Sequence, residues 1–306
     1  GKNSFFVLIF TLSGYIYTGL LYNTKIMYLF TNRVKIVIFQ YKIIALFIIV
    51  FMFFLQLRIT DEFKDYEEDL KYRSYRPVQR GVISLKTLRK IGIVTVIIQI
   101  MLAHVIDPEI IYFMIFVWIY MFLMAKEFFI KKWLTKRILI YALSHVVIMV
   151  FITLVIVEAT QYIVPKNIFD VFILQRYRHN IDFALIPLFA LNYLNGIVLE
   201  IGRKTRRADE EEHGVQTYSK LWGRKKAVVV LSLLFVIEYF LVILGLAHTY
   251  EKYFFFGGLT LLIILIVSIY FMVKFLKKDL SGKIVETVSG LWIIFSSMCM
   301  GFLPYF

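Results

Sequence analysis

Long apolar stretches recur along the whole chain, separated by short polar or charged segments. Each is close to the length of about 20 residues that a helix needs to cross the hydrocarbon core of a bilayer. We therefore predict an all-α bundle of nine transmembrane helices. The predicted spans are residues 4–22, 34–60, 91–106, 110–130, 138–157, 181–202, 227–248, 253–273 and 285–303. No small-residue cleavage site follows the first stretch, which predicts a retained helix rather than a signal peptide.

The composition indicates that lipid surrounds this chain. Of its 306 residues, 60% are hydrophobic and 18% are aromatic, whereas only about half of a soluble domain is apolar. The single cysteine, Cys299, lies in the last apolar stretch, which excludes an internal disulfide and a thiolate metal site. No linker rich in Pro, Gly or Ser divides the chain. We therefore predict a single transmembrane domain over residues 1–306.

The formal net charge of +14 is explained by topology rather than by a nucleic-acid partner. Alternate connections between the predicted spans hold 24 basic residues, and the remaining connections hold 7. The basic connections are residues 61–90, 131–137, 203–226 and 274–283. Because cytoplasmic loops carry the excess of Lys and Arg, we expect these four to be cytoplasmic. We expect a bacterial-type cell membrane, with the N-terminus inside and the C-terminus outside.

Six acidic side chains fall within residues 61–69, directly after the second predicted span. Asp61, Asp65 and Asp69 are spaced i, i+4 and i+8, so on a helix they share one face. Three like charges on one face repel one another unless a cation lies among them. In proteins, such a cation is usually Mg²⁺, bound by carboxylates together with phosphate oxygens of a substrate. The alternative is a solvated helix end, but the strict spacing beside the membrane favours a metal site.

This loop resembles the first aspartate-rich motif of the UbiA superfamily of intramembrane prenyltransferases. The resemblance is carried by Asp61-x3-Asp65-x3-Asp69, then Tyr72-Arg73, Arg76-Pro77 and Arg80-Gly81-Val82-Ile83-Ser84. The family usually has Asn at the position of Asp61, and the change keeps an oxygen ligand while adding a charge. Nine helices, with motifs after the second and the sixth, are also what the resemblance implies.

The resemblance implies Mg²⁺-dependent ionisation of a polyprenyl diphosphate and transfer of the prenyl group to a lipophilic, aromatic acceptor. The three aspartates would be the catalytic residues that hold Mg²⁺. The departing pyrophosphate needs positive charge where its own charge develops. Arg73, Arg76 and Arg80 would supply it, because guanidinium pairs with phosphate oxygens in a bidentate fork. The alternative for each arginine is contact with lipid headgroups.

The second loop, residues 203–226, departs from the family pattern. The family's second motif is DxxxD with a glycine and Thr or Ser shortly after. Gly214 and Thr217 match this tail, and Glu210 falls at the last acidic position, but Arg206 lies four residues earlier. The acidic pair is therefore broken. The two loops are expected to face each other over one cavity that opens to the cytoplasm, with Ser84 and Ser219 as candidate N-caps of the helices that follow.

Two interpretations of the second loop remain open. In the first, Glu200 moves the acidic function upstream and Glu210 or Glu211 completes a second metal site. In the second, which we favour slightly, fixed cations replace the second Mg²⁺ and bind the diphosphate directly. These cations would be Arg203, Lys204 and Arg206. A solvated charge run is the structural alternative to both.

Other polar residues lie within the predicted spans. Lys126 and Glu127 have apolar sequence on both sides and should face the interior. Lys126 would either reach the diphosphate or form a structural pair with Glu127. His145, with no acidic neighbour at helical spacing, is interpreted as a packing residue. Asn192 and Asn195 would line the cavity or join helices by hydrogen bonds. The many aromatic side chains suit shielding of a carbocation.

Two rival functions remain. Some members of the resembled superfamily are terpene cyclases, which use the same ionisation without an acceptor. A transporter would place charged residues along a path through the membrane, whereas here they gather on one side. A CDP-alcohol phosphotransferase is excluded because its Asp-Gly-x2-Ala-Arg opening is missing.

Overall fold

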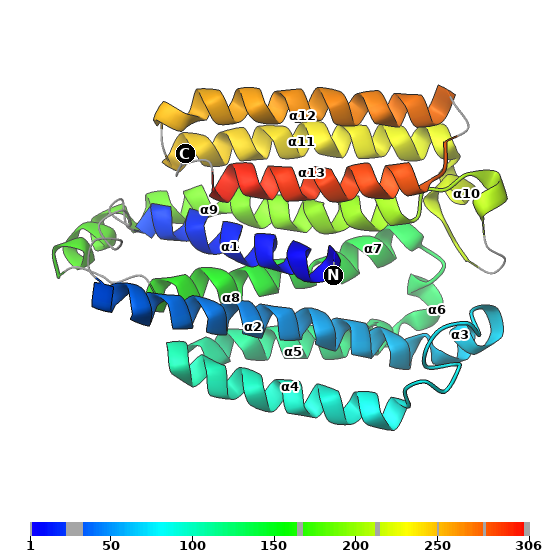
Figure 1. The fold of residues 1–306 in the computed structure, drawn as a ribbon, viewed down its shortest axis with the longest axis horizontal. Coiled ribbons are helices and arrows are strands. Elements are labelled where there is room, and N and C mark those ends of the chain that lie inside the picture. The colour runs from blue at the N-terminus through cyan, green and yellow to red at the C-terminus, as the bar shows by residue number, and fades with distance from the viewer. Residues whose placement is uncertain are drawn as a thin grey trace. The chain divides into compact units, whose positions relative to one another are not determined.

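The structure, a computed structural model, describes the backbone of residues 2–22, 33–163, 168–211, 215–249, 251–277 and 280–302. Every regular element in these ranges is a helix (Figure 1). The helices are α1 (Lys2–Tyr22), α2 (Arg33–Lys64), α3 (Tyr66–Tyr72), α4 (Leu85–Ile106), α5 (Ile110–Ala125), η2 (Glu127–Phe129), α6 (Lys131–Leu134), α7 (Ile138–Val146), α8 (Ile148–Ile163), α9 (Ile168–Arg203), η3 (Ala208–Glu210), α10 (Tyr218–Trp222), α11 (Arg224–Thr249), α12 (Glu251–Lys277) and α13 (Lys283–Gly301). Two of them, η2 and η3, are short 3₁₀ helices.

Within the described ranges, eight helical segments are long and apolar enough to cross a membrane. They are Ser4–Leu21, Tyr41–Lys64, Leu85–Ile106, Ile138–Ile163, Phe183–Arg203, Arg224–His248, Phe254–Lys277 and Lys283–Gly301. The ninth apolar helix, Ile110–Ala125, is shorter. This confirms the predicted nine-helix membrane protein. The third span begins at Leu85 rather than at 91, because its first turns are helical although they carry Lys86, Arg89 and Lys90.

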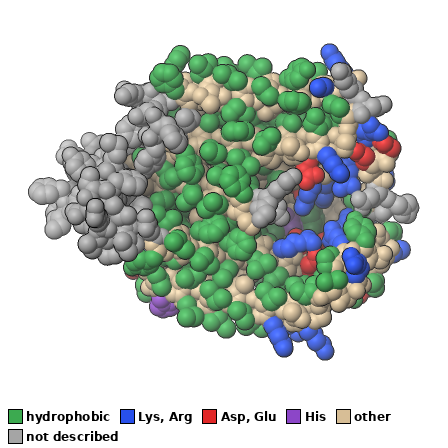
Figure 2. All heavy atoms as spheres, viewed as in Figure 1, with side chains coloured by type: hydrophobic (Ala, Val, Ile, Leu, Met, Phe, Trp, Pro, Cys, Tyr) green, Lys and Arg blue, Asp and Glu red, His purple; other side chains and the backbone are tan. Residues whose placement is uncertain are grey.

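Apolar side chains cover the outer surface of the helices (Figure 2). On α4, Ile93, Ile97 and Met101 follow one another at i, i+4 and i+8, and each is more than half exposed. Such a stripe would be costly in water, but hydrocarbon chains of lipids solvate it well. The exposed stripe therefore faces lipid.

The chain divides into two compact units. The first comprises Gly1–Thr11 and Met27–Pro165, and the second comprises Leu12–Ile26 and Lys166–Phe306. The first predicted loop lies in the first unit and the second loop in the second unit. Their meeting over one cavity, and the single domain over residues 1–306, stay predictions.

In the first unit, buried amide side chains join α2 to its neighbours, with α2 packed on α4 and α8. The Gln56 side-chain nitrogen donates to the Thr95 hydroxyl at 2.9 Å and to the Gln99 side-chain oxygen at 2.7 Å. Gln99 donates in turn to the carbonyl of Ile49 at 2.9 Å. Between apolar helices such hydrogen bonds are worth about 0.6–2 kcal/mol each. They fix the register of the helix whose end carries the acidic motif.

In the second unit, small and polar residues let helices approach closely. A Cβ added at Gly202 of α9 would lie 2.6 Å from the Cβ of Ser289 of α13, so the two backbones pack closely there. Asn195 donates to the Ser297 hydroxyl at 3.3 Å. The buried Glu238 of α11 accepts a hydrogen bond from the indole of Trp292. Asn195 therefore joins α9 to α13 by a hydrogen bond. This is one of the two roles that the sequence allowed for it, the other being to line the cavity.

The basic connections of each unit lie at one end of that unit. In the first unit, Lys64 at the end of α2 donates to Tyr141 at the start of α7, at 2.5 Å. In the second unit, the backbone N–H of Gly282 donates to Glu210 at 2.7 Å. Connections 61–90 and 131–137 therefore share an end, as do 203–226 and 274–283. This is the alternation that the charge pattern predicts, and the orientation in the cell stays a prediction.

The orientation is testable with single cysteines. Ser74→Cys and Gln216→Cys each place a thiol at an exposed position in one charged loop. In a Cys299→Ser background we expect both to resist an impermeant maleimide added outside intact cells, and to react after the membrane is opened. Efficient labelling of either site from outside would reverse the predicted orientation.

Candidate active site

The acidic motif lies on a bent helical segment at the end of α2. The helix α2 ends at Lys64 and α3 begins at Tyr66, and Asp65 between them has φ −94° and ψ 4°. Backbone hydrogen bonds nevertheless continue through the bend, from the Asp65 N–H to the Asp61 carbonyl at 2.9 Å and from the Asp69 N–H to the Asp65 carbonyl at 2.8 Å. The three aspartates therefore lie on successive hydrogen-bonded turns, as their spacing predicted.

The three aspartates differ in environment. The Asp61 side chain is 50% exposed, with one oxygen 3.9 Å from the Lys64 ammonium. Asp65 is partly exposed and makes no side-chain capping bond to α3. Asp69 is fully buried and accepts hydrogen bonds from Arg73, at 3.0 Å, and from Arg76. Asp69 therefore serves as the anchor of two guanidinium groups.

The residues fit Mg²⁺ in part. Among the described residues, no group of three or more His, Cys, Asp or Glu side chains is gathered as a metal site. Asp61 and Asp65 offer carboxylate oxygens that solvent reaches. Mg²⁺ is usually bound through one or two carboxylates plus substrate phosphates, so this pair suits it. The three-aspartate site stays a prediction, and Asp69 is the member whose surroundings fit it least.

The arginines of the first loop are held in place by local contacts. Arg73 and Arg76 are 19% and 24% exposed, and each guanidinium has five N–H groups, more than Asp69 can accept. Arg80 is exposed just before Gly81, whose φ of +77° suits a residue without a Cβ. Ser84 accepts a hydrogen bond from the Thr87 N–H at 3.1 Å. This confirms Ser84 as an N-cap, here of α4, which continues to Ile106.

Removing the Asp69 carboxylate should destabilise the loop. Breaking a buried ion pair costs about 3–5 kcal/mol, and we expect about 3 kcal/mol for Asp69→Ala, because the two arginines stay partly exposed to water. Tryptophan fluorescence during thermal unfolding in detergent measures this. The matched control is Glu68→Gln, which removes an exposed negative charge one residue away. Equal melting temperatures for Asp69→Ala and the wild type would contradict an anchoring role.

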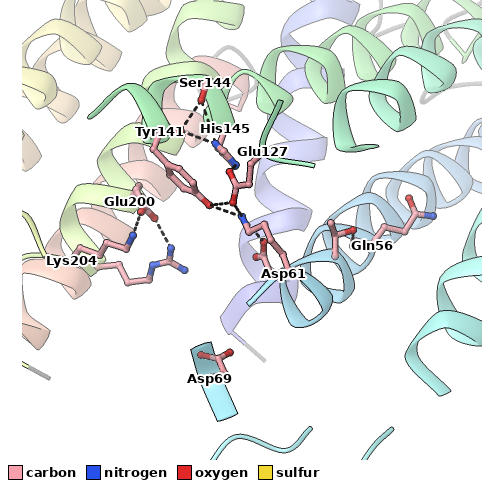
Figure 3. A network of polar contacts seen from close by, with 12 residues as sticks. Gln56, Asp61, Asp69, Glu127, Tyr141, Ser144, His145, Glu200 and Lys204 are labelled. Atoms are coloured by element: carbon pink, nitrogen blue, oxygen red, sulfur yellow. Dashed lines mark hydrogen bonds and ion pairs between the residues drawn. The ribbon is translucent and has the colours of Figure 1, made fainter. Parts of the chain in front are cut away.

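A second polar cluster, the Glu127 network, lies in the same unit (Figure 3). It consists of Lys64, Glu127, Tyr141 and His145. The Tyr141 hydroxyl donates to Glu127 at 3.3 Å, and the Lys64 ammonium lies 3.5 Å from the same oxygen. The other Glu127 oxygen lies 3.4 Å from the His145 Nε2. Glu127 is therefore a buried carboxylate with one oxygen against Tyr141 and Lys64 and the other facing the His145 ring.

This arrangement corrects one interpretation and extends another. Glu127 is buried as predicted, but Lys126 is exposed, so the two do not form an interior pair. The cationic partner of Glu127 is Lys64, which is far away in the sequence. His145 is a packed residue as predicted, with its ring stacked on Tyr141 and its Nδ1 2.8 Å from the Tyr141 carbonyl. It also lies beside Glu127, which comes from another segment rather than at helical spacing.

The backbone at Glu127 is unusual. Glu127, Phe128 and Phe129 have φ values of 49°, 52° and 62°, in the left-handed region that non-glycine residues avoid. Each such residue costs about 1–2 kcal/mol, so packing and polar contacts must hold the turn. Burial raises the pKa of Glu127, but the neighbouring His145 ring and the charge of Lys64 more than offset it. The net pKa of Glu127 lies below its ordinary value, and the carboxylate is ionised at neutral pH.

In the second unit, Glu200 holds the two cations that follow it. Glu200 lies 2.7 Å from the Lys204 ammonium and accepts a hydrogen bond from the Arg203 guanidinium. The first of these joins residues one helical turn apart. Lys204 is 28% exposed and Arg203 is 58% exposed. The group presents two positive charges around one carboxylate.

The remaining acidic residues of the second loop serve its own structure. Glu210 accepts hydrogen bonds from the backbone N–H groups of Gly282, at 2.7 Å, and Arg207, at 3.1 Å. Burial raises the pKa of Glu210, but hydrogen bonds from Ser281 and these N–H groups outweigh it and lower the net pKa. Glu211 accepts hydrogen bonds from the hydroxyl of Thr217. These contacts do not favour either carboxylate as a metal ligand.

The predicted N-cap of the following helix is wrong by two residues. Thr217, not Ser219, caps α10 and accepts a hydrogen bond from the Lys220 N–H at 3.2 Å. The Ser219 hydroxyl donates to Glu211 and accepts from the Arg206 N–H at 2.9 Å, so it is engaged in closing the loop. Gly214, which matched the family's motif tail, lies outside the described residues.

Comparison with known proteins gives a family and a shared fold. The model of the UbiA prenyltransferase family matches residues 7–282. One similar solved structure is described as "Structural and mechanistic insights into the biosynthesis of Digeranylgeranylglyceryl phosphate synthase in membranes". The alignment covers 99% of this chain and 95% of that chain, with 18% sequence identity and a TM-score of 0.57, which shows a shared fold. No curated protein matches the chain.

Proposed function

The chain belongs to the UbiA prenyltransferase family, and from this we propose that it is a Mg²⁺-dependent enzyme that ionises a polyprenyl diphosphate and prenylates a lipophilic acceptor. Aromatic compounds are the first acceptors to test. The single observation that supports this most is the first loop. There two solvent-accessible carboxylates, Asp61 and Asp65, stand two turns and one turn, respectively, before Asp69, a buried carboxylate that anchors two arginines.

Each group of the first loop has a distinct part in this proposal. Asp61 and Asp65 would hold Mg²⁺, which when bound supplies positive charge to the departing pyrophosphate. Arg73 and Arg76 keep N–H groups beyond those that Asp69 accepts, and these would donate to diphosphate oxygens. Because Asp69 fixes both guanidiniums before substrate arrives, little reorganisation is needed as the charge develops. The exposed Arg80 and Lys126 would add positive charge around the same group.

For the second loop we propose that its basic side chains, rather than a second Mg²⁺, bind the diphosphate directly. Glu210 accepts hydrogen bonds from the backbone N–H groups of Arg207 and of Gly282 in the neighbouring connection, and Glu211 accepts from Thr217, which disfavours a second metal site built on them. Arg203 and Lys204 carry two positive charges, and they share one carboxylate, that of Glu200. Their excess positive charge would act on the diphosphate in place of a second Mg²⁺.

The function is tested by turnover. Purified protein in lipid nanodiscs is incubated with allylic diphosphates of graded chain length, with Mg²⁺ or EDTA, and with or without a panel of lipophilic aromatic acceptors. Mass spectrometry and pyrophosphate release follow the products. We expect a prenylated acceptor that forms only with Mg²⁺. Hydrocarbon products that form without acceptor would show a terpene cyclase instead, and an unchanged diphosphate would contradict the proposal.

A further inference from the structure

The connection that contains α6, residues 129–137, gathers positive charge at the surface of the first unit. We call these residues the α6 segment. Four of its side chains are basic and none is acidic. The basic residues are Lys131, Lys132, Lys136 and Arg137, and all four are exposed. The α6 segment therefore presents a dense positive charge to its surroundings.

The protein does not neutralise this charge itself. Lys131, Lys132 and Lys136 form no ion pair with any residue that the structure describes. The nearest carboxylate along the chain, Glu127, is buried and already lies against Lys64. Like charges so close together repel one another unless anions lie beside them. The α6 segment is therefore suited to a negatively charged partner from outside the chain.

Exposed apolar side chains accompany the basic ones. Phe129, Ile130 and Trp133 are 68%, 48% and 46% exposed. The Arg137 guanidinium lies 4.3 Å from the centre of the Trp133 ring and donates to the Trp133 carbonyl at 3.2 Å. A tryptophan beside basic residues is typical of the level of the lipid headgroups, where one side of the ring is apolar and the other is wet. A partner with both a negative group and a hydrocarbon part would use all of these side chains.

The fold keeps the α6 segment at the end of the apolar helices. It joins the apolar helix α5 to the membrane span Ile138–Ile163, and α6 packs on η2 and α7 (Figure 1). Leu134, only 2% exposed, fixes the single turn of α6 to the protein. The exposed side chains around Leu134 therefore stay where an apolar region meets water, which in a membrane is the headgroup region.

We propose that the α6 segment binds an anionic phospholipid, with its basic side chains around the lipid phosphate and its exposed apolar side chains against the acyl chains. Ammonium and guanidinium groups both donate charge-assisted hydrogen bonds to phosphate oxygens. Phe129 belongs to the left-handed turn 127–129 as well as to this segment. A bound lipid would therefore also brace the turn that carries Glu127. The inference does not depend on the proposed function.

The test measures lipid binding directly. The purified protein in detergent is titrated with phosphatidylglycerol or phosphatidylcholine, and bound lipid is counted by native mass spectrometry. We expect the wild type to bind phosphatidylglycerol about 10-fold more tightly. Lys131→Gln/Lys132→Gln should weaken phosphatidylglycerol binding about 10-fold, because each basic residue beside an anionic lipid contributes several-fold to affinity. Lys131→Arg/Lys132→Arg keeps the charge and should bind within about twofold of the wild type.

The matched control is Lys86→Gln/Lys90→Gln. It removes two exposed lysines from the start of α4, at the same end of the same unit. We expect phosphatidylglycerol affinity to change less than about twofold, since these lysines lie outside the α6 segment. All replaced side chains are exposed, so melting temperatures without lipid should match the wild type. Equal losses in the two double glutamine variants would show a diffuse attraction of lipid and would overturn the proposal.

Two further measurements identify the lipid as the occupant. Inorganic phosphate in excess, at constant ionic strength, should leave phosphatidylglycerol binding unchanged, because free phosphate has no acyl chains. Trp133→Ala should lower the affinity at least about threefold through lost apolar contact. Displacement by phosphate, equal binding of the two lipids by the wild type, or an unchanged affinity of Trp133→Ala would each overturn the proposal.

Discussion

Asp65→Asn should lower kcat by at least about 100-fold, the loss typical when a group that stabilises transition-state charge is removed. Asp65 lies at the bend between α2 and α3, partly exposed and with no capping bond to lose. The substitution should therefore leave the melting temperature nearly unchanged. Turnover is measured by pyrophosphate release with saturating Mg²⁺, and EDTA should abolish the wild-type reaction to the same extent.

The control for this loss is again Glu68→Gln, whose exposed side chain has no assigned part in the site. It should retain nearly full turnover. A fully active Asp65→Asn variant, or a wild-type reaction that is insensitive to EDTA, would exclude Asp65 from a metal site.

The second large effect is expected at the cations of the second loop. Lys204→Gln should cost about 2 kcal/mol of transition-state stabilisation, seen as a lower kcat or a higher KM for the diphosphate. Arg203→Gln should cost less, because its side chain is 58% exposed and its charge is screened. Glu200→Gln removes the carboxylate that shares these cations and should cost less than Asp65→Asn.

The opposite pattern would favour a displaced second metal site. In that case Glu200→Gln would be as inactive as Asp65→Asn, while Lys204→Gln stayed active. The number of Mn²⁺ ions, used in place of Mg²⁺, that bind per non-hydrolysable diphosphate analogue gives an independent answer. If the cations replace the second metal ion, this protein should bind one Mn²⁺ ion fewer than a relative that has both acidic motifs.

Local sequence predicted the features that depend on neighbours along the chain. The apolar stretches predicted the spans because length and hydrophobicity alone decide whether a helix crosses lipid. Ser84 was predicted as an N-cap, and its hydroxyl accepts a hydrogen bond from the Thr87 N–H, a contact within one helical turn. The resemblance of the first loop also led to the right family.

The parts that were missed depend on contacts between segments far apart in sequence. Helical spacing placed Asp69 with the other aspartates, but the bend at Asp65 and the burial of Asp69 follow from packing. The contact between Lys64 and Glu127 joins α2 to the turn after α5. The sequence feature that indicated this contact was Glu127, a carboxylate in an apolar stretch, which requires a cationic partner. Which of the many basic residues supplies the partner is decided only by the fold.

The anchoring of two arginines by one buried carboxylate also restricts how this sequence can evolve. Loss of Asp69 alone leaves Arg73 and Arg76 without their shared acceptor, and loss of either arginine removes part of the compensation of a fully buried charge. Each single step therefore passes through a less stable protein. Among descendants of this chain, these three positions should change together or not at all. Exposed acidic neighbours such as Glu68 can be substituted independently.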